Sequence, residues 1–253
     1  MTIDRRFRST VPFYVQARLR YPPELLAAVG RLLGLDGRGR LLDLGCGPGF
    51  LAIGLADHFA EVVGMDPEPD MVAAARAAGQ AAGVEVHWVL GSSGDLGPHL
   101  GRFRVVTMGR SFHWMDREET LQALDVLVEP DGAVCLFGDR HPDRPENAWC
   151  RAWEELRHRY GERRPGGDRE SHEVVLRRSP FPVVRRIGHV YCRQTSIDEI
   201  VTRTLSMSTT SPAVLGPARP AFEAELRGAL AAAAVDGLLP EVIEAEALVA
   251  TRS

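Results

Sequence analysis

The sequence predicts an α/β protein built on a doubly wound, mostly parallel sheet of seven strands. Three observations lead to this fold class. Apolar runs alternate with helical segments over residues 40–138, each run has the length of a buried strand, and closely spaced glycines follow the first run. Strands that are regularly separated by helices pair in parallel through right-handed crossovers.

The expected elements follow this alternation along the chain. Helices are expected at 14–19 and 23–33, the second opened by Pro22 and Pro23, because proline is tolerated in a first helical turn. Strands at 40–45, 61–66, 85–91, 102–109 and 131–138 are separated by helices at 50–59, 69–82 and 117–128. Later elements are a helix at 146–160, a strand near 183–192, helices near 197–205 and 220–234, and a strand at 242–252.

The chain is predicted to form a single domain over residues 1–253. Residues 1–39 form a helical N-terminal cover, and 40–138 the core that carries the glycines. The alternation ends after Gly138, where proline and glycine become frequent, so we interpret 139–182 as an insertion over the carboxyl edge of the sheet. Residues 183–253 complete the sheet and its helices.

Composition excludes several classes of partner. The net charge of −4 argues against a nucleic-acid binder, and no apolar stretch approaches the ~18 residues that span a bilayer. The first ten residues lack the apolar centre of a secretory signal, so we expect a cytoplasmic protein. We expect a small-molecule partner, neither nucleic acid nor membrane, and a monomer or homodimer.

The lack of lysine and the spacing of the cysteines exclude several kinds of chemistry. All 30 basic residues are arginine, which excludes Schiff-base catalysis, pyridoxal phosphate attachment and a P-loop, since each needs a lysine. The four cysteines are widely spaced and form no CxxC pair, so we expect neither a disulfide framework nor a metal site.

The stretch LLDLGCGPGF, residues 41–50, predicts a ligand-binding turn. Gly45 allows a tight turn after the strand, Gly47 removes a Cβ that would block a ligand, and Gly49 lets the next helix lie close. The spacing is Gly-x-Gly-x-Gly, which differs from the Gly-x-Gly-x-x-Gly of dinucleotide folds. Asp66 ends the second strand 21 positions after Gly45, where a carboxylate can accept hydrogen bonds from both ribose hydroxyls of a nucleoside.

Asp43 distinguishes between nucleoside cofactors. Its carboxylate lies in an apolar strand end, and a buried charge needs a compensating partner. The carboxylate would repel a pyrophosphate, whereas it suits a cationic ligand. We therefore favour a positively charged cofactor over a nicotinamide dinucleotide.

LLDLGCGPGF, VVGMDPEPDMVAAAR and SFHWMD together resemble the class I S-adenosylmethionine-dependent methyltransferases, in particular the small-molecule, methyltransferase type 11-like branch. The matching motifs extend from about Tyr14 to Gly138. The resemblance implies a Rossmann-like methyltransferase fold, S-adenosyl-L-methionine as cofactor and S-adenosyl-L-homocysteine as product.

The resemblance also implies a set of cofactor-binding residues. They are Tyr14, Arg18, Tyr21, Asp43, Gly45, Cys46, Gly47, Gly49, Asp66, Pro67, Ser92, Ser93, Gly109 and Arg110. In this set the three glycines would line the methionine part, Asp43 would help to hold its amino group, and Asp66 would bind the ribose.

The resemblance also implies roles for other members of the set and for Met65, which precedes Asp66. Met65 and Pro67 would flank the adenine, and Tyr14, Arg18 and Tyr21 would close over the carboxylate end of the cofactor. Ser92 stands where the family often has aspartate, so its hydroxyl or the Ser93 N–H would have to replace a carboxylate contact to adenine.

Candidate acceptor residues follow the fourth and fifth strands. His113 would take a proton from an attacking hydroxyl or amine, or would only pack with Trp114 beside the cofactor. Asp139 and His141 would bind the acceptor or act as a base, or would be solvated surface. His172 has weaker support of the same kind.

The sequence therefore predicts an enzyme that moves a methyl group to an oxygen or nitrogen of a small molecule. The abundance of alanine, glycine and arginine is typical of a GC-rich genome, which favours secondary metabolism, including antibiotic biosynthesis, with an amino sugar, polyketide or aromatic acceptor. Alternatives are methylation of carbon or of a small organic acid's carboxyl group. Two alternatives from other classes are an NAD-dependent oxidoreductase and a non-catalytic relative that binds the cofactor.

Overall fold

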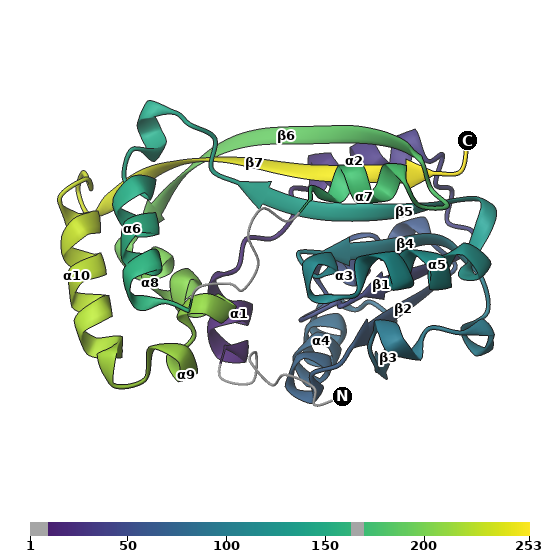
Figure 1. Ribbon diagram of the computed structural model, residues 1–253, viewed down its shortest axis with the longest axis horizontal. Helices are drawn as coiled ribbons and strands as arrows, with labels where there is room; N and C mark the ends of the chain where they lie inside the picture. Colours follow the sequence, from purple (N-terminus) through teal and green to yellow (C-terminus); the bar gives the residue numbers. More distant parts are fainter. Residues whose placement is uncertain (1–9, 163–169) are drawn as a thin grey trace. The chain divides into compact units, whose positions relative to one another are not determined.

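The computed structural model describes residues 10–162 and 170–253. Its seven strands form one sheet in the order β3-β2-β1-β4-β5-β7-β6 (Figure 1), which confirms the predicted fold class. Four neighbouring pairs are parallel: β1 with β2, β1 with β4, β2 with β3, and β4 with β5. The strands are β1 Arg40–Leu44, β2 Glu61–Asp66, β3 His87–Leu90, β4 Phe103–Gly109, β5 Val128–Arg140, β6 Val183–Ser196 and β7 Leu238–Thr251.

Helices connect the strands in the predicted alternation. They are α1 Val11–Ala17, α2 Pro23–Leu32, α3 Phe50–Gly54, α4 Pro69–Ala82, α5 Arg117–Leu127, α6 Cys150–Tyr160, α7 His172–Arg177, α8 Ile197–Leu205, α9 Pro212–Leu215 and α10 Arg219–Ala231. The short helix α7 lies in the predicted insertion 139–182, where the sequence predicts a helix only at 146–160. Its first turn is capped by Ser171, whose side chain accepts a hydrogen bond from the Val174 N–H.

The strands β5 and β6 are longer than predicted. The stretch from Glu129 to Gly132 has the composition of a turn, which hid the first residues of β5. Val128 pairs with Phe103 and Ala133 with Val105, so these residues lie at a register shift between the two paired stretches. The strand β6 continues beyond its predicted end to Ser196, whose side chain caps α8 by accepting a hydrogen bond from the Glu199 N–H.

The chain divides into two compact units, each described by itself below. The glycine-loop unit comprises residues 20–138, 168–189 and 245–253, and the helical unit comprises 1–19, 139–167 and 190–244. The boundaries differ from the predicted segments, because the expected insertion 139–182 is shared between both units. The single-domain interpretation stays a prediction.

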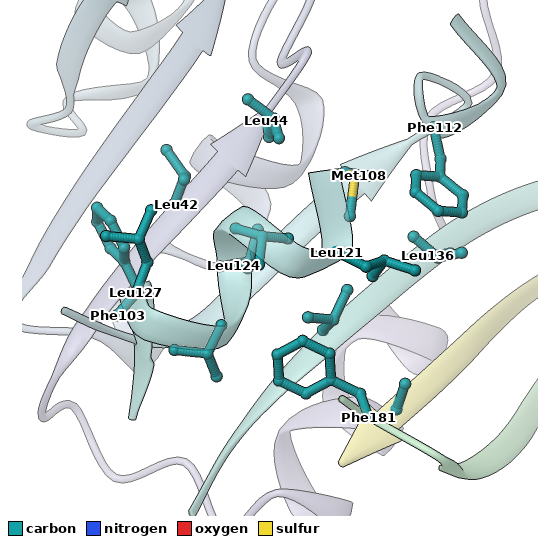
Figure 2. Packing of buried hydrophobic residues seen from close by; sticks show 14 of the residues in the cluster. Leu42, Leu44, Phe103, Met108, Phe112, Leu121, Leu124, Leu127, Leu136 and Phe181 are labelled. Atoms are coloured by element: carbon teal, nitrogen blue, oxygen red, sulfur yellow. The ribbon is translucent and has the colours of Figure 1, made fainter. Parts of the chain in front are cut away.

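Each unit has its own hydrophobic core. In the glycine-loop unit, leucines of β1 and α5 pack with Phe103, Met108, Phe112 and Phe181 (Figure 2). In the helical unit, Trp149 and Trp153 pack with residues of α8 and α10. The tryptophans therefore belong to a core, and do not form an exposed aromatic face on α6.

The indole of Trp88 in β3 rests on three glycines. An added Cβ would lie 2.4 Å from Trp88 at Gly64, 2.5 Å at Gly49, and 3.4 Å from the same ring at Gly79. Gly64 and Trp88 are register partners on adjacent strands. This packing joins β2, α4 and the start of α3 through one side chain.

The substitution Gly64→Ala is therefore expected to destabilise the glycine-loop unit. Its methyl group has to displace an indole that is also confined by Gly49, and overpacking of this kind costs about 1–3 kcal/mol. Denaturant unfolding measures the change. Gly138→Ala is the matched control, because no atom lies within 4 Å of the added Cβ in that strand. Equal stability of the two variants would contradict the packing described.

Candidate active site

The loop of residues 45–49, here the glycine loop, joins β1 to α3. The N–H groups of Gly45 and Cys46 both donate to the carbonyl of Met65, at 2.8 and 3.0 Å. Gly45, Gly47 and Gly49 have φ values of +69°, +53° and +84°. These left-handed conformations favour glycine at all three positions, as the sequence analysis expects for a tight turn.

At two of the three glycines, a side chain from outside the loop occupies the space that a Cβ would need. A Cβ on Gly45 would lie 2.5 Å from the Cβ of Ser111, which follows β4 and donates its hydroxyl hydrogen to the Leu44 carbonyl at 2.8 Å. At Gly49 the closest neighbour is the Trp88 ring, whereas the sequence analysis expected a close approach of helix to strand. Ser111 and Trp88 were not predicted, because their contacts with the loop are distant in sequence.

Asp66 fastens the glycine loop to the end of β2. Its Oδ2 accepts from the Gly47 N–H at 2.8 Å, and its Oδ1 accepts from the Glu68 N–H at 2.9 Å. Burial raises the pKa of this carboxyl, and the two N–H groups partly offset the effect. The structure thus assigns Asp66 a role in shaping the loop, and its contact with a ribose stays a prediction.

Asp43 lies beneath the glycine loop and is only 1% exposed. Its Oδ2 accepts from the Ala52 N–H in the first turn of α3 at 3.1 Å, and its Oδ1 accepts from the Thr107 hydroxyl of β4 at 2.9 Å. Burial raises its pKa to about 7, although both hydrogen bonds favour the carboxylate. Within the described part of the chain, both of its hydrogen-bond donors are neutral.

The environment of Asp43 fits a cationic ligand. A buried carboxylate that is held only by neutral donors is ionised to a limited extent near neutral pH, and a nearby positive charge would stabilise its charged form. The ammonium group of an amino-acid cofactor supplies such a charge. Thr107 is the partner that sequence reasoning missed, because it is one polar residue in an apolar strand.

Tyr21, Gly109 and Arg110 come together at the carboxyl end of β4. An added Cβ on Gly109 would lie 3.0 Å from the Tyr21 hydroxyl oxygen, and that hydroxyl donates to the Phe137 carbonyl at 3.4 Å. Arg110 has a φ of +55°, and its guanidinium lies 4.6 Å from the centre of the Tyr21 ring. A left-handed non-glycine residue at a strand end is a feature typical of functional sites.

Ser92 and Asp95 form a capping box after β3. The Ser92 hydroxyl donates to Asp95 Oδ2 at 2.9 Å and accepts from the Gly94 N–H at 3.2 Å. Asp95 also accepts from the Ser92 N–H, and this bond is the main reason that its pKa is lowered. Asp95 is therefore a carboxylate in direct contact with Ser92, and the Ser-x-x-Asp spacing was the signal that could have identified it.

The other predicted residues lie in both units. Tyr14 and Arg18 belong to the helical unit, where the Arg18 guanidinium lies 5.0 Å from the Tyr14 ring centre. Their closure over the cofactor stays a prediction. His113 and Trp114 form the short helical turn Phe112–Trp114 after β4, with ring centres 5.0 Å apart. Ser93 starts the turn Ser93–Asp95, Cys46 is buried in the glycine loop, and Pro67 follows β2.

His141 belongs to a buried ionic cluster in the helical unit. Its Nε2 lies 2.7 Å from Glu241, which also accepts from the Arg203 guanidinium at 2.6 Å and from the Thr195 hydroxyl at 2.5 Å. The His141 side chain is 15% exposed, so the solvated-surface alternative is wrong for this residue. Asp139 is the penultimate residue of β5, and its contact with the acceptor stays a prediction. Glu241 and Arg203 carry no local sequence signal and were missed.

Positive partners dominate the ionisation of Glu241. Burial alone would raise its pKa, but the hydrogen bond from His141, the charge of Arg203 and the hydrogen bond from Thr195 lower it to about 2. The carboxylate of Glu241 thus joins the β5 end, β6, α8 and β7 within the helical unit.

The chain matches a family described as a methyltransferase domain over residues 41–132. It is 30% identical over 222 residues to an uncharacterized methyltransferase of Mycobacterium tuberculosis, and the match covers 84% of each chain. It is 36% identical over 103 residues to a ubiquinone biosynthesis O-methyltransferase of Azoarcus sp., which covers 40% of this chain and 44% of that protein. An S-adenosylmethionine-dependent methyltransferase structure from Thiobacillus denitrificans, solved with S-adenosyl-L-homocysteine, has a TM-score of 0.52 at 19% identity, and the match covers 99% and 100% of the two chains.

This chain belongs to the class I S-adenosylmethionine-dependent methyltransferases. It is an enzyme that uses S-adenosyl-L-methionine, as its glycine loop and the buried Asp43 led us to expect. The family assignment decides against the NAD-dependent oxidoreductase. Within residues 10–162 and 170–253, no helix is both long and apolar enough to cross a membrane. Cytoplasmic location and oligomeric state stay predictions.

The ionic cluster makes a prediction for stability. The pKa of Glu241 is about 2, against an ordinary value of 4.5, so its contribution is complete above about pH 5 and is lost as the pH falls towards 2. The lowered pKa corresponds to about 3 kcal/mol of folding free energy. Urea unfolding between about pH 2 and pH 6 measures this loss.

Glu241→Gln should flatten this pH dependence and destabilise the chain by about 3–5 kcal/mol, because Arg203 is left buried without its counter-charge. Glu244→Gln, on the same strand and paired with the more exposed Arg140, should cost less than about 1 kcal/mol and keep the pH dependence. The same pH profile in both variants would show that Glu241 is not the titrating group.

Proposed function

We propose that the chain transfers a methyl group to an oxygen or nitrogen atom of a small-molecule acceptor. The observation that carries this proposal is the position of His113 and the 43%-exposed Trp114, which follow Ser111 by two and three residues. Ser111 packs on Gly45 of the glycine loop. A titratable group and an exposed ring thus follow β4, the parallel neighbour of the strand β1 that leads into the glycine loop. The similarity to an O-methyltransferase over 103 residues supports oxygen as one acceptor atom.

The residues of the chain suit this reaction. Bound S-adenosyl-L-methionine supplies a methyl group that is already activated by its sulfonium. The glycine loop would hold the methionine part, and Asp43 would balance the ammonium group. His113 would take the proton that the acceptor hydroxyl or amine gives up as its bond to the methyl carbon forms. Positioning provides much of the acceleration in such a displacement.

Secondary metabolism remains part of the proposal, with an amino sugar, polyketide or aromatic as acceptor. Methylation of carbon or of a small organic acid's carboxyl group is the competing reaction. A methyl-transfer assay over hydroxyl, amine, carboxyl and carbon acceptors separates them, with S-adenosyl-L-homocysteine release as the readout. Turnover confined to carbon or carboxyl acceptors would overturn the proposal.

The proton on Asp43 makes the cofactor contact testable without turnover. At about pH 6 a carboxyl with a pKa of about 7 is mostly protonated, so an ammonium group bound near it should release close to one proton. At about pH 8 the carboxyl is already ionised and the release should vanish. Calorimetry with S-adenosyl-L-homocysteine in buffers of different ionisation enthalpy measures the proton count.

Asp43→Asn is the control for this experiment, because it keeps the shape of the side chain but has no proton to release. The variant should lose the pH-dependent release and bind S-adenosyl-L-homocysteine at least about tenfold more weakly, as expected for loss of a charge-assisted contact. Binding by the unchanged chain without proton release at about pH 6 would contradict a cation near Asp43.

The base role of His113 makes a further prediction. His113→Gln should lower kcat for a hydroxyl acceptor by about 10²-fold or more near neutral pH, the usual contribution of a general base. Its affinity for S-adenosyl-L-homocysteine should stay within about twofold, since the residue would act on the acceptor. An unchanged kcat would leave His113 with the packing role alone.

A further inference from the structure

His172 lies beside His113 although 59 positions separate the two residues in the sequence. Their ring centres are 6.4 Å apart, and the ring planes are within 19° of parallel. His172 also meets Phe112 edge-on at 5.2 Å, and His113 lies 5.0 Å from Trp114. These four rings, here called the aromatic row, all belong to the glycine-loop unit.

The aromatic row is fixed to the cofactor loop at one end. Ser111, the residue before Phe112, donates to the Leu44 carbonyl and packs against Gly45. Phe112 is buried in the core, whereas Trp114 is exposed and His172 is partly exposed. The row thus begins at the glycine loop and presents ring surface on the side of the sheet where β4 ends.

Arg117 determines which nitrogen of His172 carries the proton. Nη1 of the Arg117 guanidinium lies 3.4 Å from Nδ1 of His172, and this Nη1 also donates to the Glu170 carbonyl at 2.7 Å. A guanidinium can only donate, so Nδ1 must accept and the ring proton lies on Nε2. Burial, and then the charge of Arg117, lower the pKa of His172, so the ring is neutral at physiological pH.

His172 and His113 therefore have different chemistry. A neutral imidazole whose Nδ1 already accepts a hydrogen bond offers a single Nε2–H donor, and it cannot serve as a base. Such a donor, held beside a base and a row of rings, suits an oxygen atom of a flat molecule.

We propose that His172 positions the acceptor, and that the acceptor is a planar hydroxylated ring with a second oxygen next to the methylated one. The ring would pack on the aromatic row, and the second oxygen would accept from Nε2–H of His172. This inference rests on the proposed function and selects the aromatic class among its acceptors. His172 keeps its proton throughout and acts as a positioning residue.

Binding to the complex with S-adenosyl-L-homocysteine tests the proposal without turnover. The probes are 2-hydroxybenzoate and catechol, phenol as the ring without a second oxygen, and glucosamine as a polar acceptor without an aromatic ring. We expect the two-oxygen rings to bind about tenfold or more tightly than phenol, the usual effect of one hydrogen bond to a partly buried donor. Nitrogen chemical shifts of His172 should show Nε2 protonated before and after binding.

Three variants test separately the N–H donor of His172, its ring, and the helix α7 that carries it. His172→Phe keeps a ring but removes the donor, so it should abolish the preference for two-oxygen rings over phenol. His172→Gln restores an N–H near the position of Nε2 and should recover part of that preference. Val174→Ala, at an exposed position on the same helix, is the matched control and should leave the preference unchanged.

Activity provides the second readout. For an acceptor with two adjacent oxygens, His172→Phe should raise KM about tenfold or more and leave kcat and the affinity for S-adenosyl-L-homocysteine within about threefold. Tighter binding of glucosamine than of every aromatic probe, no binding of any aromatic probe, or an unchanged preference in His172→Phe would each overturn the inference. Selective binding of two-oxygen rings without any methyl transfer would support it and refute the proposed function instead.

Discussion

The cofactor region depends on one buried carboxylate and its two neutral donors. Asp43 accepts from Thr107 on β4 and from the Ala52 N–H on α3, and it lies on β1 itself. Three elements that surround the glycine loop are thereby joined at a single side chain. Because the interior gives the carboxylate no cation among the described residues, its ionisation is sensitive to whatever charge approaches the loop.

Asp66 complements this arrangement from the second strand. It accepts from Gly47 in the middle of the loop, while the first two loop amides donate to the Met65 carbonyl. The loop is thus shaped by β2 from one side and anchored by β1 and β4 from below. A preformed loop of this kind loses little conformational entropy on binding, which is the general advantage of preorganised sites.

The sequence was sufficient for what is local. A strand, three glycines and an acid at the end of the next strand predict the fold class and the tight glycine loop, because their spacing is determined by backbone geometry. Contacts between distant segments were not predictable in this way. No sequence feature near Gly45 indicates its contact with Ser111, and none near Gly49 indicates its contact with Trp88. The six residues of α7 are too few for helical periodicity to become visible.

The same difference between local patterns and contacts of distant segments applies to the candidate site. His113 stands in a motif that follows a predicted strand, whereas His172 gains its interest only from the fold, through Arg117 and the parallel ring of His113. His141 was predicted from its place after a strand, but its buried partners Glu241 and Arg203 come from β7 and α8.

Two of the buried carboxylates, Asp43 and Glu241, differ in how their charge is balanced. Glu241 is surrounded by Arg203, His141 and Thr195, which lower its pKa to about 2, so its negative charge is balanced within the protein. Asp43 is equally buried but has only a hydroxyl and an amide as donors, and its pKa is raised to about 7. A balanced carboxylate stabilises the fold and has no need of a ligand. An unbalanced one is costly to the free protein and gains most from a cation that binds near it. We therefore propose that Asp43, and not Glu241, faces the sulfonium amino acid.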